Sequence, residues 1–362
     1  MPPAKNTAKN ANLHSAKREK NDEFYTQLSD IENELKHYST HFSGKVVLCN
    51  CDDPRVSAFF RYFYLNFCYL GLKKLIAVCY KNLSSNLFCQ NKEEQAVYCI
   101  YDGKKRKDDR ATVPIDEFIK KNEWGILIGD GDFRSEECIE LLKQADIVCT
   151  NPPFSLFREY VAQLIEYNKK FIIIGNNNAI TYKEIFKLIK DNKLWMGYSP
   201  RSMNFLDQNG NVNCVNANWF TNLDITKRHK WLKLYKTYKA AEYPKYDNYD
   251  VIEVGKVADI PVDYEGVMGV PVTFLDKYNP GQFEILGATQ RGCHDDVPDT
   301  KKYDDYWEVK PDGTPTGSSG SKTNENANLA RNDGKKNYFI NKEGRVIQSA
   351  YQRIFICRKK KP

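Results

Sequence analysis

An asparagine followed by two prolines and a phenylalanine, Asn151-Pro152-Pro153-Phe154, is where the side chains of this sequence could most directly do chemistry. Consecutive prolines continue neither a strand nor a helix, so the four residues predict a stiff turn. The Asn151 side-chain oxygen and the Pro152 carbonyl could be two fixed acceptors for an exocyclic amino group such as that of adenine, whose lone pair is delocalised into the ring. Phe154 could stack on the base. The same residues could also form an ordinary turn after a buried strand.

The flanks of this tetrapeptide predict that it joins a strand to a helix. Residues 147–150 are apolar and mostly β-branched, which is typical of a buried strand. Apolar residues then recur at helical spacing at Leu156, Phe157, Tyr160, Val161, Leu164 and Ile165. The turn would lie at the carboxyl end of a strand, where open α/β sheets bind their ligands. Together these residues resemble the (Asp/Asn/Ser)-Pro-Pro-(Tyr/Phe) signature of amino-group methyltransferases that use S-adenosylmethionine.

A second turn with chemical potential precedes the first. The apolar run 124–128 predicts a strand that closes on Gly131-Asp132-Phe133, and a helix is expected over 136–144. The Asp132 carboxylate could accept a hydrogen bond from the amino group of a bound adenine nucleoside while Phe133 packs on its ring. In the family that the sequence resembles, Gly-Asp-Phe has this role toward the cofactor.

The expected first strand, 45–49, ends in Asn50-Cys51-Asp52-Asp53-Pro54. The glycine-rich turn of the general methyltransferase pattern is missing here, but Cys-Asn-Cys-Asp-Asp-Pro resembles the corresponding motif of the EcoRI-type enzymes. Phe24-Tyr25-Thr26, ahead of a helix with apolar Ile31, Leu35 and Tyr38, resembles the segment beside the methionine end of the cofactor. The resemblance thus implies cofactor contacts from Tyr25, Thr26, Asn50, Asp52, Asp53, Pro54, Asp132 and Phe133.

Composition limits the class of protein. The chain has 362 residues, 41% of them hydrophobic, and a formal charge of +7, which fits a globular protein that approaches a polyanion. Its 11 cysteines include no Cys-x-x-Cys pair, which predicts reduced thiols, a cytoplasmic location and no metal site. We expect no membrane segment, because no 18-residue apolar stretch occurs.

Composition also suggests how the chain is divided. We expect a disordered basic arm at 1–21, a cofactor-binding catalytic domain at 22–225 with an insertion near 83–116, and a target-recognition region at 226–362. That last region opens with lysines and arginines interleaved with aromatic residues, a mixture suited to nucleic acid. Within it, 311–337 reads as a long flexible loop. Trp219-Phe220 aligns with the segment that, in such enzymes, stacks on the target base opposite the Phe154 position; an ordinary aromatic strand is the alternative.

The resemblance covers about 22–357 and identifies the chain as similar to the EcoRI-type adenine-specific (N6) DNA methyltransferases. It implies an α/β fold: a Rossmann-like sheet with helices on both faces, followed by the recognition region. It also implies transfer of a methyl group from S-adenosylmethionine to adenine N6 in duplex DNA by base flipping, with restriction-modification as the setting. The expected partners are double-stranded DNA and a cognate restriction endonuclease, and the expected state is a monomer. The alternatives are an amino-group methyltransferase acting on RNA or a protein glutamine, and a DNA-binding relative that has lost catalysis.

Overall fold

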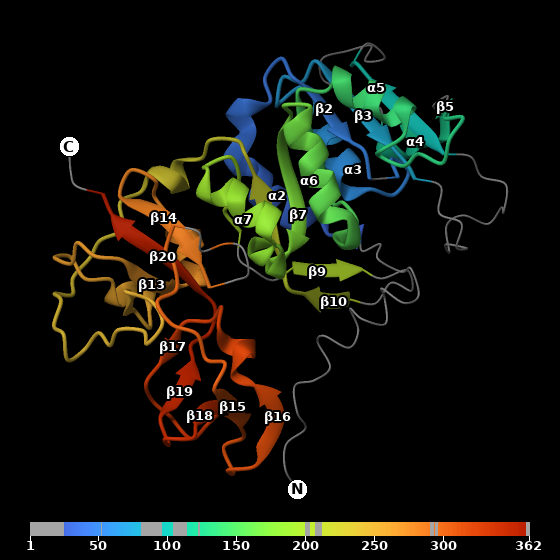
Figure 1. Ribbon diagram of the computed structural model, residues 1–362. Coiled ribbons are helices and arrows are strands. Elements are labelled where there is room, and N and C mark those ends of the chain that lie inside the picture. The colour runs from blue at the N-terminus through green and yellow to red at the C-terminus, as the bar shows by residue number, and fades with distance from the viewer. Residues whose placement is uncertain are drawn as a thin grey trace, which may run out of the picture. The chain divides into compact units, whose positions relative to one another are not determined.

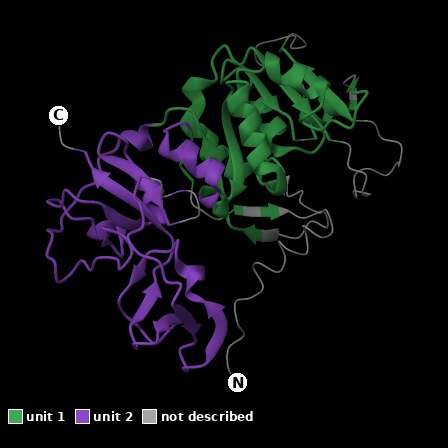
Figure 2. Ribbon diagram, in the orientation of Figure 1, with its two compact units in different colours: residues 1–180, 194–225 green, residues 181–193, 226–362 purple. Residues whose placement is uncertain are grey.

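The computed structural model describes residues 25–51, 53–80, 96–103, 114–121, 124–199, 203–206, 212–289, 293 and 296–359. The chain forms two compact units, shown in Figure 2. Unit 1 comprises 1–180 and 194–225, and unit 2 comprises 181–193 and 226–362. The main boundary between the units follows residue 225, where the amino-acid composition changes. Residues 181–193, which were expected in the first domain, group with unit 2 instead. The functions predicted for the two parts stay predictions at this point.

Unit 1 is built on one eight-stranded sheet, with the order β5-β4-β3-β2-β6-β7-β11-β8. β2, β3, β6 and β7 are parallel, whereas β4, β5 and β11 each run antiparallel to a neighbour. The chain passes from β2 outward to β3 and later returns to the other side of β2 as β6, so the strand order reverses between β2 and β6. Ligands bind outside the carboxyl ends of strands at such a switch point. The strands are β2 (Val46–Cys49), β3 (Lys74–Val78), β4 (Val97–Tyr101), β5 (Gly125–Ile126), β6 (Ile147–Thr150), β7 (Lys170–Asn176), β8 (Trp195–Met196) and β11 (Ala217–Thr221).

Helices pack on both faces of this sheet (Figure 1). One face holds α2 (Leu28–Leu35), α3 (Ala58–Leu65) and α4 (Ile115–Lys121), where the Phe59 ring meets Trp219 at 5.8 Å between centroids. The other holds α5 (Glu136–Gln144) and α6 (Phe157–Glu166), where Phe157 meets Phe220 at 5.0 Å. Because β2 and β6 are buried along their whole length, their sequences are continuous apolar runs. The predicted Rossmann-like α/β class is confirmed.

Unit 1 also contains a small antiparallel sheet, which was not predicted. Its order is β1-β9-β10, with β1 at Tyr25–Thr26, β9 at Met203–Leu206 and β10 at Val212–Val215. Tyr25 pairs with Leu206, and Thr26 with Phe205. The Phe-Tyr-Thr segment ahead of the first helix is therefore a strand, held by residues about 180 positions later in the chain.

Within the expected insertion near 83–116, the strand-like run 96–101 belongs to the large sheet. β4 pairs antiparallel with β3 from Leu75↔Tyr101 to Val78↔Tyr98, so this part of the range is core structure. The strand expected at 124–128 is short, because β5 contains two residues and Ile128 is 98% exposed. Residues 104–107, Lys-Lys-Arg-Lys, which the sequence predicts to be a charged loop, lie outside the described residues.

Unit 2 contains one helix, α7 (Lys183–Lys190), among its described residues, and two sheets. The first has the order β12-β13-β20-β14 and the second the order β16-β15-β18-β19-β17. These strands are β12 (Ile252–Glu253), β13 (Met268–Pro271), β14 (Phe283–Ala288), β15 (Tyr306–Val309), β16 (Pro315–Ser319), β17 (Asn328–Leu329), β18 (Tyr338–Asn341), β19 (Val346–Ser349) and β20 (Arg353–Arg358). The 3-10 helices of the chain are η1 (Lys36–His41), η2 (Phe154–Leu156), η3 (Asn177–Thr181), η4 (Thr226–His229), η5 (Val257–Asp259), η6 (Val272–Lys277) and η7 (Gly320–Thr323). No described helix is long and apolar enough to span a bilayer.

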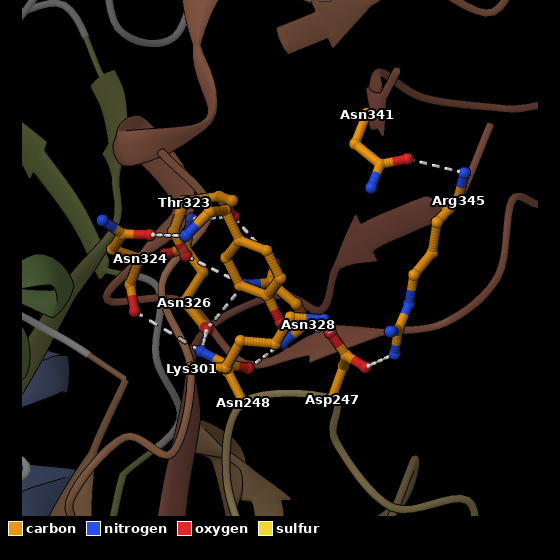
Figure 3. A network of polar contacts seen from close by, with 10 residues as sticks. Asp247, Asn248, Lys301, Thr323, Asn324, Asn326, Asn328, Asn341 and Arg345 are labelled. Carbon is orange, nitrogen blue, oxygen red and sulfur yellow. Dashed lines mark hydrogen bonds and ion pairs between the residues drawn. The ribbon is translucent and has the colours of Figure 1, made fainter. Parts of the chain in front are cut away.

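The flexible loop predicted at 311–337 is wrong as a description of structure, because this range contains β16, η7 and β17. Polar side chains hold it in place, as Figure 3 shows. The buried Asn248 amide accepts from the backbone N–H of Asn328 at 3.0 Å, and the Asn328 amide donates to the Thr323 carbonyl at 2.9 Å. Asparagine and threonine make the composition look like a loop, yet here they satisfy the backbone of a small sheet.

Glu308 adds a charged centre to the same sheet. Its carboxylate accepts from the Lys322 ammonium at 2.9 Å, the Thr316 hydroxyl at 2.8 Å and the Asn337 amide at 3.2 Å. Burial alone would raise the pKa of Glu308, but the hydrogen bonds from Lys322 and Thr316 outweigh burial and lower that pKa to about 2. The ionised carboxylate is therefore part of the folded structure.

Candidate active site

The Asn-Pro-Pro-Phe turn lies where its sequence predicts, directly after β6 and before η2 and α6. Pro152 is buried, and the Pro153 carbonyl accepts from the Leu156 N–H at 3.0 Å, which closes the first helical turn. The Thr150 hydroxyl accepts from the Cys51 N–H at 3.2 Å, so the ends of β6 and β2 are joined. The turn thus opens at the switch point of the sheet.

Asn50, directly after β2, is 2% exposed, and its amide is oriented by a tyrosine from α6. The fully buried Tyr160 hydroxyl donates to Asn50 Oδ1, and the Cys51 thiol lies 3.9 Å from the same oxygen. Among the described residues, no acceptor lies within hydrogen-bonding distance of the buried Asn50 Nδ2. A buried donor in this condition is costly unless a ligand satisfies it.

The same face of α6 holds the second predicted motif. The Tyr160 ring packs edge-on against Phe133 with centroids 5.0 Å apart, and Phe133 is 5% exposed. One turn further along α6, the Gln163 amide donates to the Phe133 carbonyl at 3.0 Å. The helix that follows the Asn-Pro-Pro-Phe turn therefore positions both Asn50 and Phe133, two residues predicted to contact the cofactor.

Gly131 brings this loop to the carboxyl end of β3. Its φ is +78°, a conformation that glycine adopts without strain. A Cβ at this position would lie 2.5 Å from the Cys79 carbonyl oxygen and 3.2 Å from the Tyr80 Cα, so only glycine permits the approach. Although β5 is short and antiparallel, the loop after it thus reaches the edge of the parallel sheet where the predicted site lies.

The Asp132 carboxylate is engaged by a nearby arginine. Arg134 donates from Nε to Oδ1 at 2.9 Å and from Nη2 to Oδ2 at 2.7 Å, and it also reaches Glu159 at 3.0 Å. The hydrogen bond from Arg134 holds the pKa of Asp132 below its usual range, so this carboxylate is ionised at neutral pH. A contact from Asp132 to a nucleoside amino group would use the remaining acceptor positions of its oxygens, and that role stays a prediction.

Asp53 and Pro54 lie on the loop between β2 and α3. The Asp53 carboxylate accepts from Arg55 Nε at 2.9 Å and Nη2 at 2.7 Å, and the Asp53 carbonyl accepts from the Ser57 N–H at 2.7 Å. Ser57 in turn caps α3 by accepting from the Phe59 N–H at 3.1 Å. Asp53 and the buried Pro54 therefore shape the turn, while Asp52 lies outside the described residues.

Phe154, the last residue of the Asn-Pro-Pro-Phe turn, faces the small sheet. Its ring meets Phe205 of β9 in a T-shaped contact with centroids 6.4 Å apart. Phe205 pairs in register with Thr26 of β1, which is 7% exposed. Within the described part of the chain, the buried Thr26 hydroxyl has no hydrogen-bond partner. Tyr25 occupies the preceding position of the same strand.

Trp219 and Phe220 are both fully buried, and they lie on opposite faces of β11. Trp219 belongs to the core cluster against which Phe154 packs, whereas Phe220 packs on Phe157 of α6. Neighbouring residues of a strand point to opposite faces, so the two rings cannot form one stacking surface. The stacking role stays a prediction, and only Trp219 is on the Phe154 side of the sheet.

The residues at this edge fit the cofactor that the sequence predicts. Two of the predicted contact residues, Asn50 and Thr26, carry buried polar atoms for which the described residues supply no partner. Asn50 Nδ2 is a donor suited to a carboxylate or hydroxyl of the ligand, and Thr26 Oγ1 can donate or accept. Phe133 adds an aromatic wall from the loop that Gly131 brings close.

Sequence reasoning missed three buried polar residues that hold this edge together. Tyr160 and Gln163 were seen only as parts of a helix, although their buried positions one turn apart follow from the apolar spacing. Glu34 lies within the apolar face of α2 and is fully buried. Its carboxylate accepts hydrogen bonds from the Tyr198 N–H at 2.8 Å and the Ser199 N–H at 2.7 Å. A charged residue at a core position of a helix was the available signal.

The family of the adenine-specific methyltransferase EcoRI matches residues 12–360. The type II methyltransferase M.EcoRI of Escherichia coli is 52% identical over 301 residues, which cover 77% of this chain and 89% of the relative. M.MgeORF184P of Mycoplasma genitalium is 41% identical over 76% of this chain and 85% of its own length. M.MpnI of Mycoplasma pneumoniae is 42% identical, with 76% and 84% covered. No solved structure matches the chain.

These matches confirm the resemblance, the adenine-specific methyltransferase activity and the S-adenosylmethionine donor that were predicted from the sequence. The family match spans both units, so unit 2 is part of the similarity as well as the large sheet. A turn with the amino-methyltransferase pattern at the switch point, beside buried donors fit for a cofactor, agrees with that assignment. The chain therefore belongs to the EcoRI family of adenine-specific methyltransferases.

Proposed function

We propose that the chain methylates adenine N6 at a specific site in duplex DNA, with catalysis in unit 1 and target recognition in unit 2. The observation that carries the catalytic assignment is the position of the Asn151 turn at the switch point, one strand away from Asn50. S-adenosylmethionine supplies a methyl group that its sulfonium already activates, so no metal or nucleophilic side chain is required. The protein must align the reacting atoms and make the adenine nitrogen nucleophilic.

In this proposal the stiff turn acts on the adenine amino group. The Asn151 side-chain oxygen and the Pro152 carbonyl accept from the two N6 hydrogens and draw the lone pair out of the ring. N6 then forms the new N–C bond as the C–S bond of the donor breaks; the sulfur leaves as a neutral thioether, and N6 releases a proton to water. Asn50 and Thr26 bind the cofactor through their buried polar atoms, and Phe133 packs on its adenine.

The target adenine must leave the duplex, because N6 is unreachable inside the base stack. Extrusion costs a few kcal/mol, and stacking on Phe154 contributes roughly 1–3 kcal/mol against it. Phe154 is partly exposed and held from the side by Phe205, which suits a ring that must offer one face to a base. Phe154 also packs against the core cluster that contains Trp219.

The remaining parts of the proposal concern partners. We also propose that residues after 225 recognise the DNA sequence and that a cognate restriction endonuclease acts at the same site. The enzyme is proposed to be monomeric and cytoplasmic. The net charge of +7 supports a polyanionic substrate. The DNA contacts themselves are taken further below.

The decisive experiment compares wild type with Asn151→Ala, using labelled S-adenosylmethionine and duplex DNA, with calorimetry for cofactor binding. Wild type should transfer label to adenine N6, and the variant should lose at least about 100-fold in rate, as when one oxyanion donor is removed, while keeping its cofactor affinity. Asn33→Ala, on the exposed side of α2, is the matched control and should be fully active. Near wild-type turnover in Asn151→Ala would refute the catalytic role. Labelling of RNA or of a protein glutamine, with none in DNA, would refute the substrate.

A further inference from the structure

An extended segment of unit 2, Lys230–Lys239, presents a row of basic and aromatic side chains. It contains no helix, and its one bridge pairs Lys236 with Pro261. We define the exposed strip as Trp231, Lys233, Tyr235 and Lys239. Lys230 and Lys236 are exposed beside it.

The backbone of this segment is held firmly at its start. The Leu232 N–H donates to Gln282 Oε1 at 2.7 Å, and the Leu232 carbonyl accepts from Gln282 Nε2 at 2.8 Å. Gln282 is 6% exposed, so a buried amide satisfies both backbone groups of Leu232. The side chains on either side of Leu232 are thereby fixed to point outward.

The second half of the segment is anchored as well. The Lys236 carbonyl accepts from the Val262 N–H at 2.8 Å, and the Tyr238 N–H donates to Asp263 at 2.7 Å. The Tyr238 ring packs against Tyr264, with centroids 4.6 Å apart. Along the segment, Leu232, Leu234 and Tyr238 are half-buried, whereas the odd-numbered residues and Lys236 are exposed.

The exposed rings and charges are unusually accessible for an anchored segment. Trp231 is 52% exposed and Tyr235 is 78% exposed. Within the described part of the chain, Lys239 pairs with Glu242 at 3.0 Å, and no ion pair holds Lys230, Lys233 or Lys236. Large aromatic surface that is rigidly held beside uncompensated positive charge marks an interaction surface for an anionic partner with flat apolar groups.

We propose that the exposed strip is a contact surface for duplex DNA, a proposal that rests on the function proposed above. Alternate residues of a strand are about 6.6 Å apart, which is close to two steps of 3.4 Å along a DNA strand. Trp231, Lys233 and Tyr235 alternate along the segment and can therefore contact successive positions of the duplex. Its lysines neutralise phosphates, and Trp231 and Tyr235 contact base edges or sugars, as extended ribbons do in the major groove.

The experiment measures the affinity of the full chain for a duplex containing its methylation site, by fluorescence anisotropy over a series of salt concentrations. Lys233→Ala in the strip, combined with Lys236→Ala beside it, should reduce the slope of log affinity against log salt by about 2, one for each lost phosphate contact. Tyr235→Ala should raise Kd by about 5- to 150-fold, the range expected for the loss of one base-edge contact in the groove. The affinity for S-adenosylmethionine should be unchanged in every variant, because unit 1 is not altered.

Two residues of unit 2 outside the strip are matched controls. Tyr351 is 81% exposed, and Lys245 forms an exposed ion pair with Asp250 at 2.7 Å. Tyr351→Ala and Lys245→Ala should bind DNA as wild type does. Unchanged Kd and salt slope in the strip variants would overturn the inference while leaving the proposed function standing. Failure of wild type to methylate duplex DNA would overturn the proposed function, and the inference with it.

Discussion

Replacing Tyr160 with phenylalanine tests whether α6 orients the cofactor site. The change removes only the hydroxyl that donates to Asn50 Oδ1 and keeps the ring that packs on Phe133. In the variant the Asn50 side-chain amide can rotate by about 180°, which exchanges its oxygen and nitrogen. Cofactor binding must then first restore the orientation in which Nδ2 faces the ligand. We therefore expect weaker cofactor binding without loss of the fold.

The size of the effect follows from the burial of Asn50, which is 2% exposed. A buried polar group that loses its partner costs about 1–3 kcal/mol. Since each ~1.4 kcal/mol changes an equilibrium constant about tenfold, the Kd for S-adenosylmethionine should rise about 5- to 150-fold if the whole cost falls on binding. The KM for the cofactor should rise with it, while kcat at saturating cofactor and the Kd for DNA stay near wild type.

Calorimetry with S-adenosylmethionine, steady-state kinetics and thermal unfolding together decide this prediction. Tyr303→Phe is the control, because Tyr303 is also fully buried and its hydroxyl donates to Asp247 at 2.9 Å, within unit 2. That variant should lose some stability and keep its cofactor affinity. A lower unfolding temperature for Tyr160→Phe with unchanged cofactor Kd would show that Tyr160 serves the fold alone, and the reasoning would be refuted.

Three further changes test other parts of the structure. Gly131→Ala should lower the free energy of unfolding by more than about 1 kcal/mol and weaken cofactor binding, because φ is +78° and the added Cβ would meet the Cys79 carbonyl; denaturant titration and calorimetry measure both. Glu34→Gln should cost about 1–3 kcal/mol of stability, since an amide cannot accept through both atoms, whereas the exposed Glu32→Gln on the same helix should cost almost nothing in the same titration. Glu308 has a folded-state pKa below its unfolded value of 4.5, so its contribution is present above about pH 4.5 and is lost as pH falls toward about 2. Hydrogen exchange in the five-stranded sheet should increase over that range, and Glu308→Gln should remove this acid dependence; an identical pH profile in the variant would contradict the assignment.

The sequence by itself determined the features that depend on near neighbours. Two prolines after a buried strand permit only a turn, so the position of Asn151 could be predicted from four residues. The apolar spacing after it determined α6, and the continuous apolar runs determined β2 and β6. The motif resemblance added the cofactor and the reaction, which no local pattern contains.

Partners that are distant along the chain could be decided only by tertiary structure. Tyr160 and Asn50 are separated by 110 residues, and periodicity gives no information about such a pair. The same holds for β1, whose Thr26 pairs with Phe205, and for β4, which looked like part of an insertion until it paired with β3.

For 311–337 the composition predicted a flexible loop, whereas the range contains β16, η7 and β17. Its serines, threonines and asparagines lack the apolar alternation that marks a strand, because hydrogen bonds between side chains and backbone do much of the work that an apolar core does elsewhere. For Trp219 and Phe220, the sequence could not show which of the two rings lies on the Phe154 side of the sheet. Strand alternation sends one ring to each face of the sheet, and which face carries the site depends on how the helices pack. Sequence periodicity therefore reports that a residue is buried, whereas only the folded chain decides what it is buried against.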